Sequence, residues 1–256
     1  MPGLLKSSAM AAPSIAVITP VRNGMAHLQE TIECVMAQQY APLEMIVVDD
    51  GSTDGSGALA RSLGSCRVLE TPGIGPAGAR NLGIRASNSD LLMFLDADDL
   101  LGPSVFQSSV EALLGAPEAG FAQGCVQNFK MRPDGRMNIF TRPYRYINVG
   151  SGVWRRSVFE TIGLFDESLR YCEDLDFFMR CWERDISKVL MDCLVLLYRR
   201  HPGNMTRGLQ GVDFGTMRAY RKRIERIRRG EYDPASPRRM AWPDYFGRGP
   251  DIMDMD

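Results

Sequence analysis

Short apolar runs alternate with amphipathic stretches over residues 14–115 of the chain. The unbroken runs are typical of strands that are buried on both faces, and the stretches between them have helical spacing. The strands are expected at Ile15–Thr19, Met45–Asp49, Cys66–Glu70 and Leu91–Leu95, and the helices at Met25–Gln38, Ser56–Leu63, Ala77–Ala86 and Pro103–Leu114. Such repetition predicts an α/β fold with a doubly wound, mostly parallel sheet, whose carboxyl strand ends share one edge.

The alternation of strands and helices ends after Gly115, which predicts a second half with a mixed sheet over residues 116–210. Phe121–Lys130 and Met137–Phe140 flank a turn and read as a hairpin. Further elements are expected at Arg155–Ile162 and Asp174–Arg184, both helical, and at Val189–Leu197, a strand. The pattern thus divides the chain into a tail at 1–13, one domain at 14–210 and a C-terminal part at 211–256.

The C-terminal part opens with a basic helix, expected at Val212–Arg229. One hypothesis is a solvated helix whose apolar side chains pack inward, namely Phe214, Met217, Tyr220, Ile224 and Ile227. The other is a helix that rests on an anionic membrane, because basic amphipathic helices can bind such surfaces. The remainder, rich in proline, glycine and aspartate, is expected to be a loose tail.

Two of the predicted strands end in bursts of aspartate. Asp49 and Asp50 follow the second strand, and Asp96, Asp98 and Asp99 follow the fourth. Ligands of such sheets bind beyond the carboxyl ends of the strands, so both bursts should open into one crevice. Crowded carboxylates favour a cation, and Mg²⁺ or Mn²⁺ accepts carboxylate oxygen together with substrate phosphates. The alternative is that the aspartates only cap the following helices.

A glycine-rich segment after the third strand offers a further contact. Gly73, Gly75 and Gly78 have the spacing of a dinucleotide-binding loop, which leaves an NAD-dependent oxidoreductase as an alternative. The loop follows the third strand instead of the first, and this argues against that alternative. A loop near a nucleotide is the better interpretation, with Arg80 as a phosphate or base contact or simply as a surface arginine.

Composition narrows the class of protein. The 256 residues carry a net charge of −1, which gives no argument for a nucleic-acid partner. Six cysteines are scattered without metal-ligand spacing and suit a reducing compartment. Residues 1–13 lack the apolar core of a signal peptide, and no run is long enough to span a membrane. A cytoplasmic protein is therefore expected.

Taken together, these motifs resemble the family 2 glycosyltransferases of the GT-A fold. The resemblance is carried, in order, by the segments Ile18–Gly24, Ile46–Asp54, Gly78–Gly83 and Phe94–Asp99. It is dense over residues 14–115, which would form the nucleotide-sugar half, and thinner up to His201 in the acceptor half. It implies a Rossmann-like sheet, a nucleotide-sugar donor and a divalent metal.

The resemblance also implies roles for residues of the first half. Thr19 and Pro20 would line the pocket of the base, and Asp50 would bind the base itself. Asp96, with Ala97 beside it, would face the ribose or sugar. Asp98 would bind the metal that bridges the diphosphate, together with Asp96, and Asp99 could replace or assist Asp98. The donor would most often be a UDP-sugar.

In the second half, Glu173 and Asp174 fall where the family carries an acidic pair at a helix start. Asp174 is the expected general base, since a carboxylate there could take the proton of an acceptor hydroxyl; both residues could instead only complement the helix dipole. His201 could ligate the metal or contact a phosphate. Gly152 and Trp154 would line the acceptor side, although an aromatic residue there could equally belong to the core.

The resemblance therefore implies an activity that is metal-dependent, inverts the anomeric centre and is directed at an acceptor hydroxyl. That acceptor would be a glycan, a lipid-linked glycan or another hydroxyl compound, as in the synthesis of cell-surface polysaccharide or other glycoconjugates. The alternative from another class is a relative that binds the nucleotide sugar without turnover. A phosphatase of the D-x-D type is disfavoured because Leu100 stands where a threonine or valine is usual.

Overall fold

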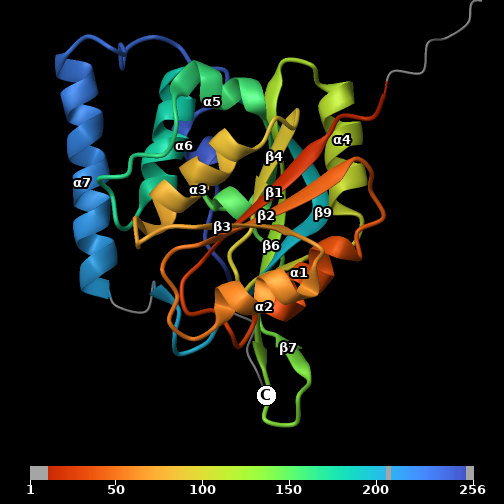
Figure 1. Ribbon diagram of the computed structural model, residues 1–256. Coiled ribbons are helices and arrows are strands. Elements are labelled where there is room, and N and C mark those ends of the chain that lie inside the picture. The colour runs from red at the N-terminus through yellow and green to blue at the C-terminus, as the bar shows by residue number, and fades with distance from the viewer. Residues whose placement is uncertain (1–10, 206–208, 252–256) are drawn as a thin grey trace, which may run out of the picture.

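The computed structural model describes residues 11–205 and 209–251 and has a central sheet with helices on both faces (Figure 1). The strands are β1 (Ile15–Val21), β2 (Leu43–Asp49), β3 (Arg67–Glu70), β4 (Leu91–Phe94), β5 (Leu100–Leu101), β6 (Ala119–Met131), β7 (Met137–Ile139), β8 (Gly152–Arg155) and β9 (Ser187–Arg199). The helices are α1 (Leu28–Met36), α2 (Ser56–Leu63), α3 (Gly75–Ala86), α4 (Val105–Gly115), a 3₁₀ turn η1 (Val149–Ser151), α5 (Arg156–Ile162), α6 (Glu173–Glu183), α7 (Leu209–Arg228) and α8 (Trp242–Phe246). In these ranges, no helix has the length and apolar character that crossing a bilayer requires.

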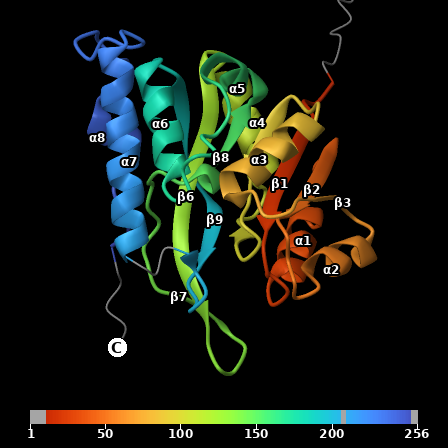
Figure 2. The same ribbon diagram turned by 60° about the vertical axis from the view of Figure 1, so that its left-hand side comes forward.

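The sheet has a parallel half and a mixed half. Its strands run in the order β3-β2-β1-β4-β8-β6-β9-β5, with β7 paired to β6. The first four of these strands are parallel, whereas β8 is antiparallel to both of its neighbours. Figure 2 separates the two halves, with the N-terminal strands on one side and β6, β8 and β9 on the other. The predicted doubly wound, mostly parallel sheet with a mixed second half is confirmed.

The apolar strands are buried on both faces because successive side chains point to opposite sides. In β1, Ile15 and Val17 join the core beneath α1, α2 and α4. Ala16 and Ile18 join the second core, beneath α3, α5, α6 and α8. This explains why the strands read as continuous apolar runs instead of alternating ones.

The predicted helices and strands of residues 14–200 are all present, with shifted ends. Helix α4 begins at Val105, so the expectation that Pro103 opens it is wrong. Ser104, with a φ of 55°, makes the transition into that helix instead. Strand β8 was not predicted, because its four residues lie between a turn and a helix and are too few to show a period. It joins the two halves of the sheet by pairing with β4 and β6.

The expectation of a loose C-terminal tail is also wrong for the residues that the structure describes. Helix α8 packs beside α6 and places Tyr245 and Phe246 in the core, at 2% and 7% exposure. The ammonium of Lys188 on β9 donates to the carbonyl of Tyr245 at 2.6 Å. Prolines and glycines in this segment mark turns between packed aromatic residues, which a compositional argument does not distinguish from disorder.

We expect Phe246→Ala to lower the free energy of unfolding by about 3 kcal/mol, because it removes a buried ring that stacks on Trp242 at 4.0 Å. Phe214→Ala is the matched control, since that ring is 66% exposed, and it should change stability by less than about 0.5 kcal/mol. Urea unfolding of both variants makes the comparison. Equal effects would show that the C-terminal segment does not belong to the core.

Candidate functional site

The two acidic strand ends lie at the same edge of the sheet, on either side of β1. The Asp50 amide donates to the Val21 carbonyl at 2.8 Å, and the Leu95 amide donates to the Ile18 carbonyl at 3.1 Å. Strand β1 pairs in parallel with β2 and with β4, so the segments after both strands leave the sheet in the same direction. The aspartates that follow β2 and those that follow β4 therefore lie at one edge of the sheet, as the sequence predicted.

Asp50 holds the glycine-rich loop that leads into α3. Its carboxylate is 4% exposed and accepts hydrogen bonds from the amides of Ile74 and Gly75, at 2.6 and 2.8 Å, and from the Thr71 hydroxyl. Gly73 in this loop has a φ of +100°, which favours glycine. Asp50 thus fixes the backbone beside the crevice, and its contact with a base remains a prediction.

Thr19 and Pro20 at the end of β1 differ in their access to the crevice. Thr19 is completely buried. It lies on the same face of β1 as Ile15 and Val17, which belong to the core beneath α1. Its hydroxyl has no hydrogen-bond partner among the described residues. The expectation that the Thr19 side chain lines a base pocket is therefore wrong, whereas Pro20 is partly exposed at the edge.

Arg80 connects the donor edge to the helix start of the second half. Its guanidinium, on α3, donates to Asp96 at 2.7 Å and to Glu173 at 2.5 Å, and the residue is 5% exposed. Burial alone would lower the pKa of Arg80, but the charges of the two carboxylates raise it above its ordinary value. Arg80 therefore bridges two acidic residues of the protein and is not the open phosphate contact that the sequence predicted.

The three aspartates after β4 have different surroundings. The Asp96 side chain is 44% exposed and pairs with Arg80, and Ala97 beside it is partly buried. Asp98 is partly exposed, whereas Asp99 is 1% exposed and accepts the Arg199 amide at 2.8 Å. Burial, together with the other two charges, raises the pKa of Asp99 well above its ordinary value. Of the two registers that the sequence left open, Asp98 is the one whose side chain is partly exposed at this edge.

His201 joins this edge from the loop after β9. Its Nε2 lies 2.7 Å from a carboxylate oxygen of Asp98, which also accepts from the Asn204 amide at 3.3 Å. The His27 ring lies 4.9 Å from the His201 ring. Burial lowers the pKa of His27, and the charges of Arg199 and His201 add to the effect. The two histidines are close because β9 ends at this edge of the sheet. Their proximity depends on residues far apart in the chain and could not be predicted from a local sequence pattern.

Asp98 and His201 are the residues that could hold a metal. Carboxylate oxygen and neutral imidazole nitrogen both bind divalent cations, and Mg²⁺ or Mn²⁺ at such sites takes its other ligands from substrate phosphates and water. The part of the chain that the structure describes contains no cluster of three or more His, Cys, Asp or Glu side chains arranged as metal ligands. The carboxylate of Asp98 and the imidazole of His201 therefore fit a cation that takes its remaining ligands from a diphosphate.

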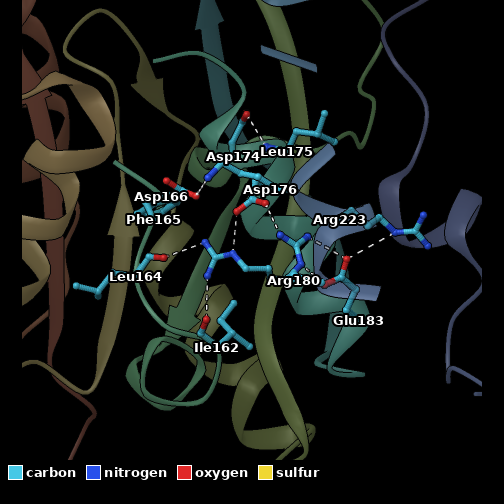
Figure 3. Close-up of polar contacts among 12 residues, drawn as sticks. Ile162, Leu164, Phe165, Asp166, Asp174, Leu175, Asp176, Arg180, Glu183 and Arg223 are labelled. Carbon is cyan, nitrogen blue, oxygen red and sulfur yellow. Dashed lines mark hydrogen bonds and ion pairs between the residues drawn. The ribbon is translucent and has the colours of Figure 1, made fainter. Parts of the chain in front are cut away.

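Three carboxylates crowd the first turn of α6, and two of them are paired with arginine. Glu173 pairs with Arg80, and Asp176 accepts from Arg180 at 2.8 Å and from Arg226 at 2.9 Å. Figure 3 shows Asp176 and Arg180 below Asp174 at the start of this helix. Asp176, at 1% exposure, is thus a buried structural group.

Asp174 differs from both neighbours, since within the described ranges it forms no ion pair. It is partly exposed, and its carboxylate accepts only the Leu175 amide, at 2.7 Å. Burial raises the pKa of Asp174 to about 7, and the nearby charge of Glu173 adds to this shift. A carboxylate with a pKa near neutrality is suited to take a proton from a hydroxyl and to release it again.

The predicted acceptor-side residues lie in the core. Trp154 is completely buried, stacks on Phe121 at 3.9 Å and donates to the Val149 carbonyl at 3.1 Å. Its expected place on the acceptor wall is therefore wrong, because β8 lies inside the sheet. Gly152 is buried in the same strand, where a Cβ atom would come within 2.8 Å of the Ala122 carbonyl oxygen. Close packing of β8 on β6 explains this glycine without an acceptor.

Two exposed tyrosines that the sequence did not predict as site residues are Tyr146, which feels the charge of Asp174, and Tyr220, which interacts with Tyr146. Tyr146, before η1, is 42% exposed. Burial raises the pKa of Tyr146, and the charges of Asp174, Tyr220 and Cys172 contribute to it. Tyr220 comes from α7 and is also 42% exposed. These aromatic residues, and not Trp154, are available to contact an acceptor beside Asp174.

A comparison with known families decides the assignment. The sequence profile described as glycosyl transferase family 2 matches residues 16–174, from β1 to the start of α6. The chain belongs to glycosyl transferase family 2. The match ends at Asp174 and includes both acidic strand ends, whereas His201 lies beyond it. The oxidoreductase alternative has no support from this family.

This family 2 chain has curated relatives that are longer than itself. It is 27% identical over 217 residues to the uncharacterized glycosyltransferase EpsJ of Bacillus subtilis, covering 76% of this chain and 63% of EpsJ. It is 30% identical over 201 residues to the succinoglycan biosynthesis protein ExoU of Rhizobium meliloti, covering 68% and 58%. The minor teichoic acid biosynthesis protein GgaA of B. subtilis is 27% identical over 186 residues, covering 64% and 42%. The chain thus spans less than two thirds of the length of these relatives.

Solved structures show the same fold. TarS residues 1–349 of S. aureus, in complex with UDP-GlcNAc, superimpose with a TM-score of 0.61 at 18% identity. The match covers 76% of the family 2 chain and 61% of the TarS fragment. The UDP complex of the same fragment gives a TM-score of 0.58, also at 18% identity, and covers 74% and 61%. The predicted GT-A fold is confirmed.

The ionisation of Asp174 predicts how stability depends on pH. A free aspartate has a pKa of about 3.9, so between about pH 4 and pH 7 the folded chain binds more protons at this residue than the unfolded chain. The free energy of unfolding should therefore fall as pH rises through this window, by at most about 1.4 kcal/mol for each pH unit.

Asp174→Asn removes this titration and should flatten the decline in stability between pH 4 and pH 7. Asp134→Asn is the control, because that aspartate is exposed in the β6–β7 hairpin, and it should retain the decline. Urea unfolding at several pH values measures both slopes. A slope unchanged in Asp174→Asn would show that the carboxylate titrates normally.

Proposed function

We propose that the chain transfers a sugar from a nucleotide-sugar donor, most readily a UDP-sugar, to an acceptor hydroxyl with inversion at the anomeric carbon. The observation that carries the proposal is the position of Asp174, a partly exposed carboxylate that forms no ion pair within the described residues and follows Glu173, which Arg80 connects to Asp96 at the donor edge. Family membership supports the reaction class. The TarS structures support the base of the donor, because that protein was crystallised with UDP and UDP-GlcNAc.

In the proposed reaction the donor side binds the departing diphosphate, and the acceptor side removes the proton of the hydroxyl. The acceptor oxygen forms a bond to the anomeric carbon, and the bond from that carbon to the diphosphate breaks, so the nucleoside diphosphate leaves with the electron pair. Asp174 takes the proton of the acceptor hydroxyl. Glu173 does not compete for this proton, because its carboxylate is 8% exposed and paired with Arg80.

The donor would lie along the edge of β1, β2 and β4. Asp50 holds the loop that borders the base and ribose, and Pro20 and Asp96 are the partly exposed groups nearby. Asp98 and His201 would hold a divalent cation, which offsets the charge that develops on the departing diphosphate. The acceptor would approach from the side of Tyr146 and Tyr220. A reducing compartment such as the cytoplasm is proposed for this site, since all six cysteines are thiols.

The relatives suggest the kind of product. ExoU is named for succinoglycan biosynthesis and GgaA for minor teichoic acid biosynthesis. We therefore propose a role in the synthesis of a cell-surface polysaccharide or related glycoconjugate.

The donor site can be tested by thermal unfolding with UDP-, GDP- and dTDP-sugars, each with and without Mn²⁺. A donor at about 100 times its Kd should stabilise the chain by about 2.7 kcal/mol, and part of this gain should require the metal. Asp98→Asn should lose the metal-dependent part, whereas Asp134→Asn should keep it. The donor site would be contradicted if none of these nucleotide sugars stabilised the chain.

The same experiment distinguishes an enzyme from a binding-only relative when release of free UDP from the donor is measured. Wild-type chain should release UDP, and Asp174→Asn should bind the donor equally well but release UDP about 100-fold more slowly. Donor binding without any UDP release by the wild type would favour the binding-only alternative. Undiminished release in Asp174→Asn would place the base elsewhere.

A further inference from the structure

Helix α7 has an apolar side that faces outward. Figure 1 shows α7 at the edge of the molecule, with α6 on its inner side. Four large apolar residues on α7 are exposed, which are Phe214 at 66%, Met217 at 67%, Tyr220 at 42% and Ile224 at 47%. The expectation that these side chains pack inward is therefore wrong. We name this set, together with the exposed Arg221 and Arg228 beside it, the α7 outer face.

The inner side of α7 explains why the apolar residues point outward. Arg226 lies buried between α6 and α7 and donates to Asp176 at 2.9 Å and to Glu183 at 2.6 Å. Lys222 pairs with Asp166 at 2.6 Å, and Gly215 packs against the backbone of Tyr171. Figure 3 shows Arg223 and Glu183 within the same network. The charged residues of this helix thus satisfy the carboxylates of α6 and fix its rotation.

Helix α7 cannot rotate to bury its apolar side without breaking these contacts. Rotation of α7 would separate Arg226 and Arg223 from Glu183 and leave Asp176 with Arg180 alone, and buried charges that lose their partners are strongly unfavourable. The outer face is therefore a permanent feature of the fold. Contiguous exposed apolar side chains of this kind mark interaction surfaces.

The charges around the α7 outer face indicate what it binds. The exposed arginines are Arg218, Arg221, Arg228 and Arg229, and the nearby carboxylates are Asp213, Glu225 and Glu231. Arg221 pairs with Glu225 and Arg229 with Glu231, which leaves Arg218 and Arg228 against Asp213 in the described part of the helix. Pairing this face with a second copy of itself would bring arginine toward arginine, which disfavours a symmetric dimer.

We propose that the α7 outer face docks on the surface of an anionic lipid bilayer. Phe214, Met217 and Ile224 would enter the boundary between headgroups and acyl chains, as in other interfacial helices. The long stems of Arg221 and Arg228 would lie along this apolar surface while their guanidinium groups contact lipid phosphates. The docking does not depend on the proposed sugar transfer.

Vesicle flotation of the full chain tests this surface. Wild type should bind vesicles of phosphatidylcholine with 30% phosphatidylglycerol more strongly than vesicles of phosphatidylcholine alone. Met217→Ser/Ile224→Ser should lower the partition coefficient at least about tenfold, because it removes most of the inserted apolar area. Leu114→Ser is the matched control, since that leucine on α4 is 64% exposed on another side of the molecule, and it should bind like wild type.

A second pair of variants tests the charge. Arg221→Gln/Arg228→Gln should lose most of the preference for anionic vesicles while retaining binding through the apolar residues. Nucleotide-induced thermal stabilisation, measured on the same variants, should remain at the wild-type value, so that failure of docking is distinguished from failure of the donor site.

Three results would overturn the proposal. Wild type could fail to float with anionic vesicles, or the Leu114→Ser control could lose binding equally. The third is a dimer of the wild type in light scattering that Met217→Ser/Ile224→Ser converts to a monomer, which would assign the α7 outer face to a second copy of the chain.

Discussion

The pairing of arginines with carboxylates at the start of α6 determines the chemistry of this fold. Glu173 pairs with Arg80, and Asp176 with Arg180 and Arg226, so that of these three carboxylates only Asp174 has no cationic partner among the described residues. Those arginines come from α3, α6 and α7, which are distant in sequence. The pairing therefore ties the donor half, the helix that carries the proposed base and the C-terminal helix into one arrangement. Burial, together with the nearby charge of Glu173, raises the pKa of Asp174 to about 7.

Much of the first half could be predicted from the sequence because its signals are local. Apolar runs define β1, β2 and β4, and parallel strands place Asp50 and Asp98 at one edge whatever the details of packing. The partners of each side chain were less predictable. Thr19 and Arg80 are polar residues of motifs near the crevice, yet Thr19 points beneath α1 and Arg80 is enclosed by carboxylates. Their roles depend on contacts between residues far apart in the chain.

The second half shows the same limit more strongly. Apolar residues of a helix usually face the core, so the pattern of α7 predicted that Met217 and Ile224 pack inward. Helix α7 has the opposite orientation because Arg226 faces α6, where it pairs with the buried carboxylates of Asp176 and Glu183. Likewise, Trp154 lies within the sheet since β8 joins its two halves, a pairing that four residues of sequence do not reveal.

The ionisation of Asp174 tests this account most directly. Carbon-13 NMR of aspartate-labelled chain, with Asp174→Asn to assign the carboxyl signal, measures its pKa without substrate. A midpoint of about 7 is expected, because the carboxylate is withdrawn from water and lies beside the charge of Glu173. A midpoint near the ordinary value of about 4 would contradict it, because Asp174 would then be no different from an exposed aspartate.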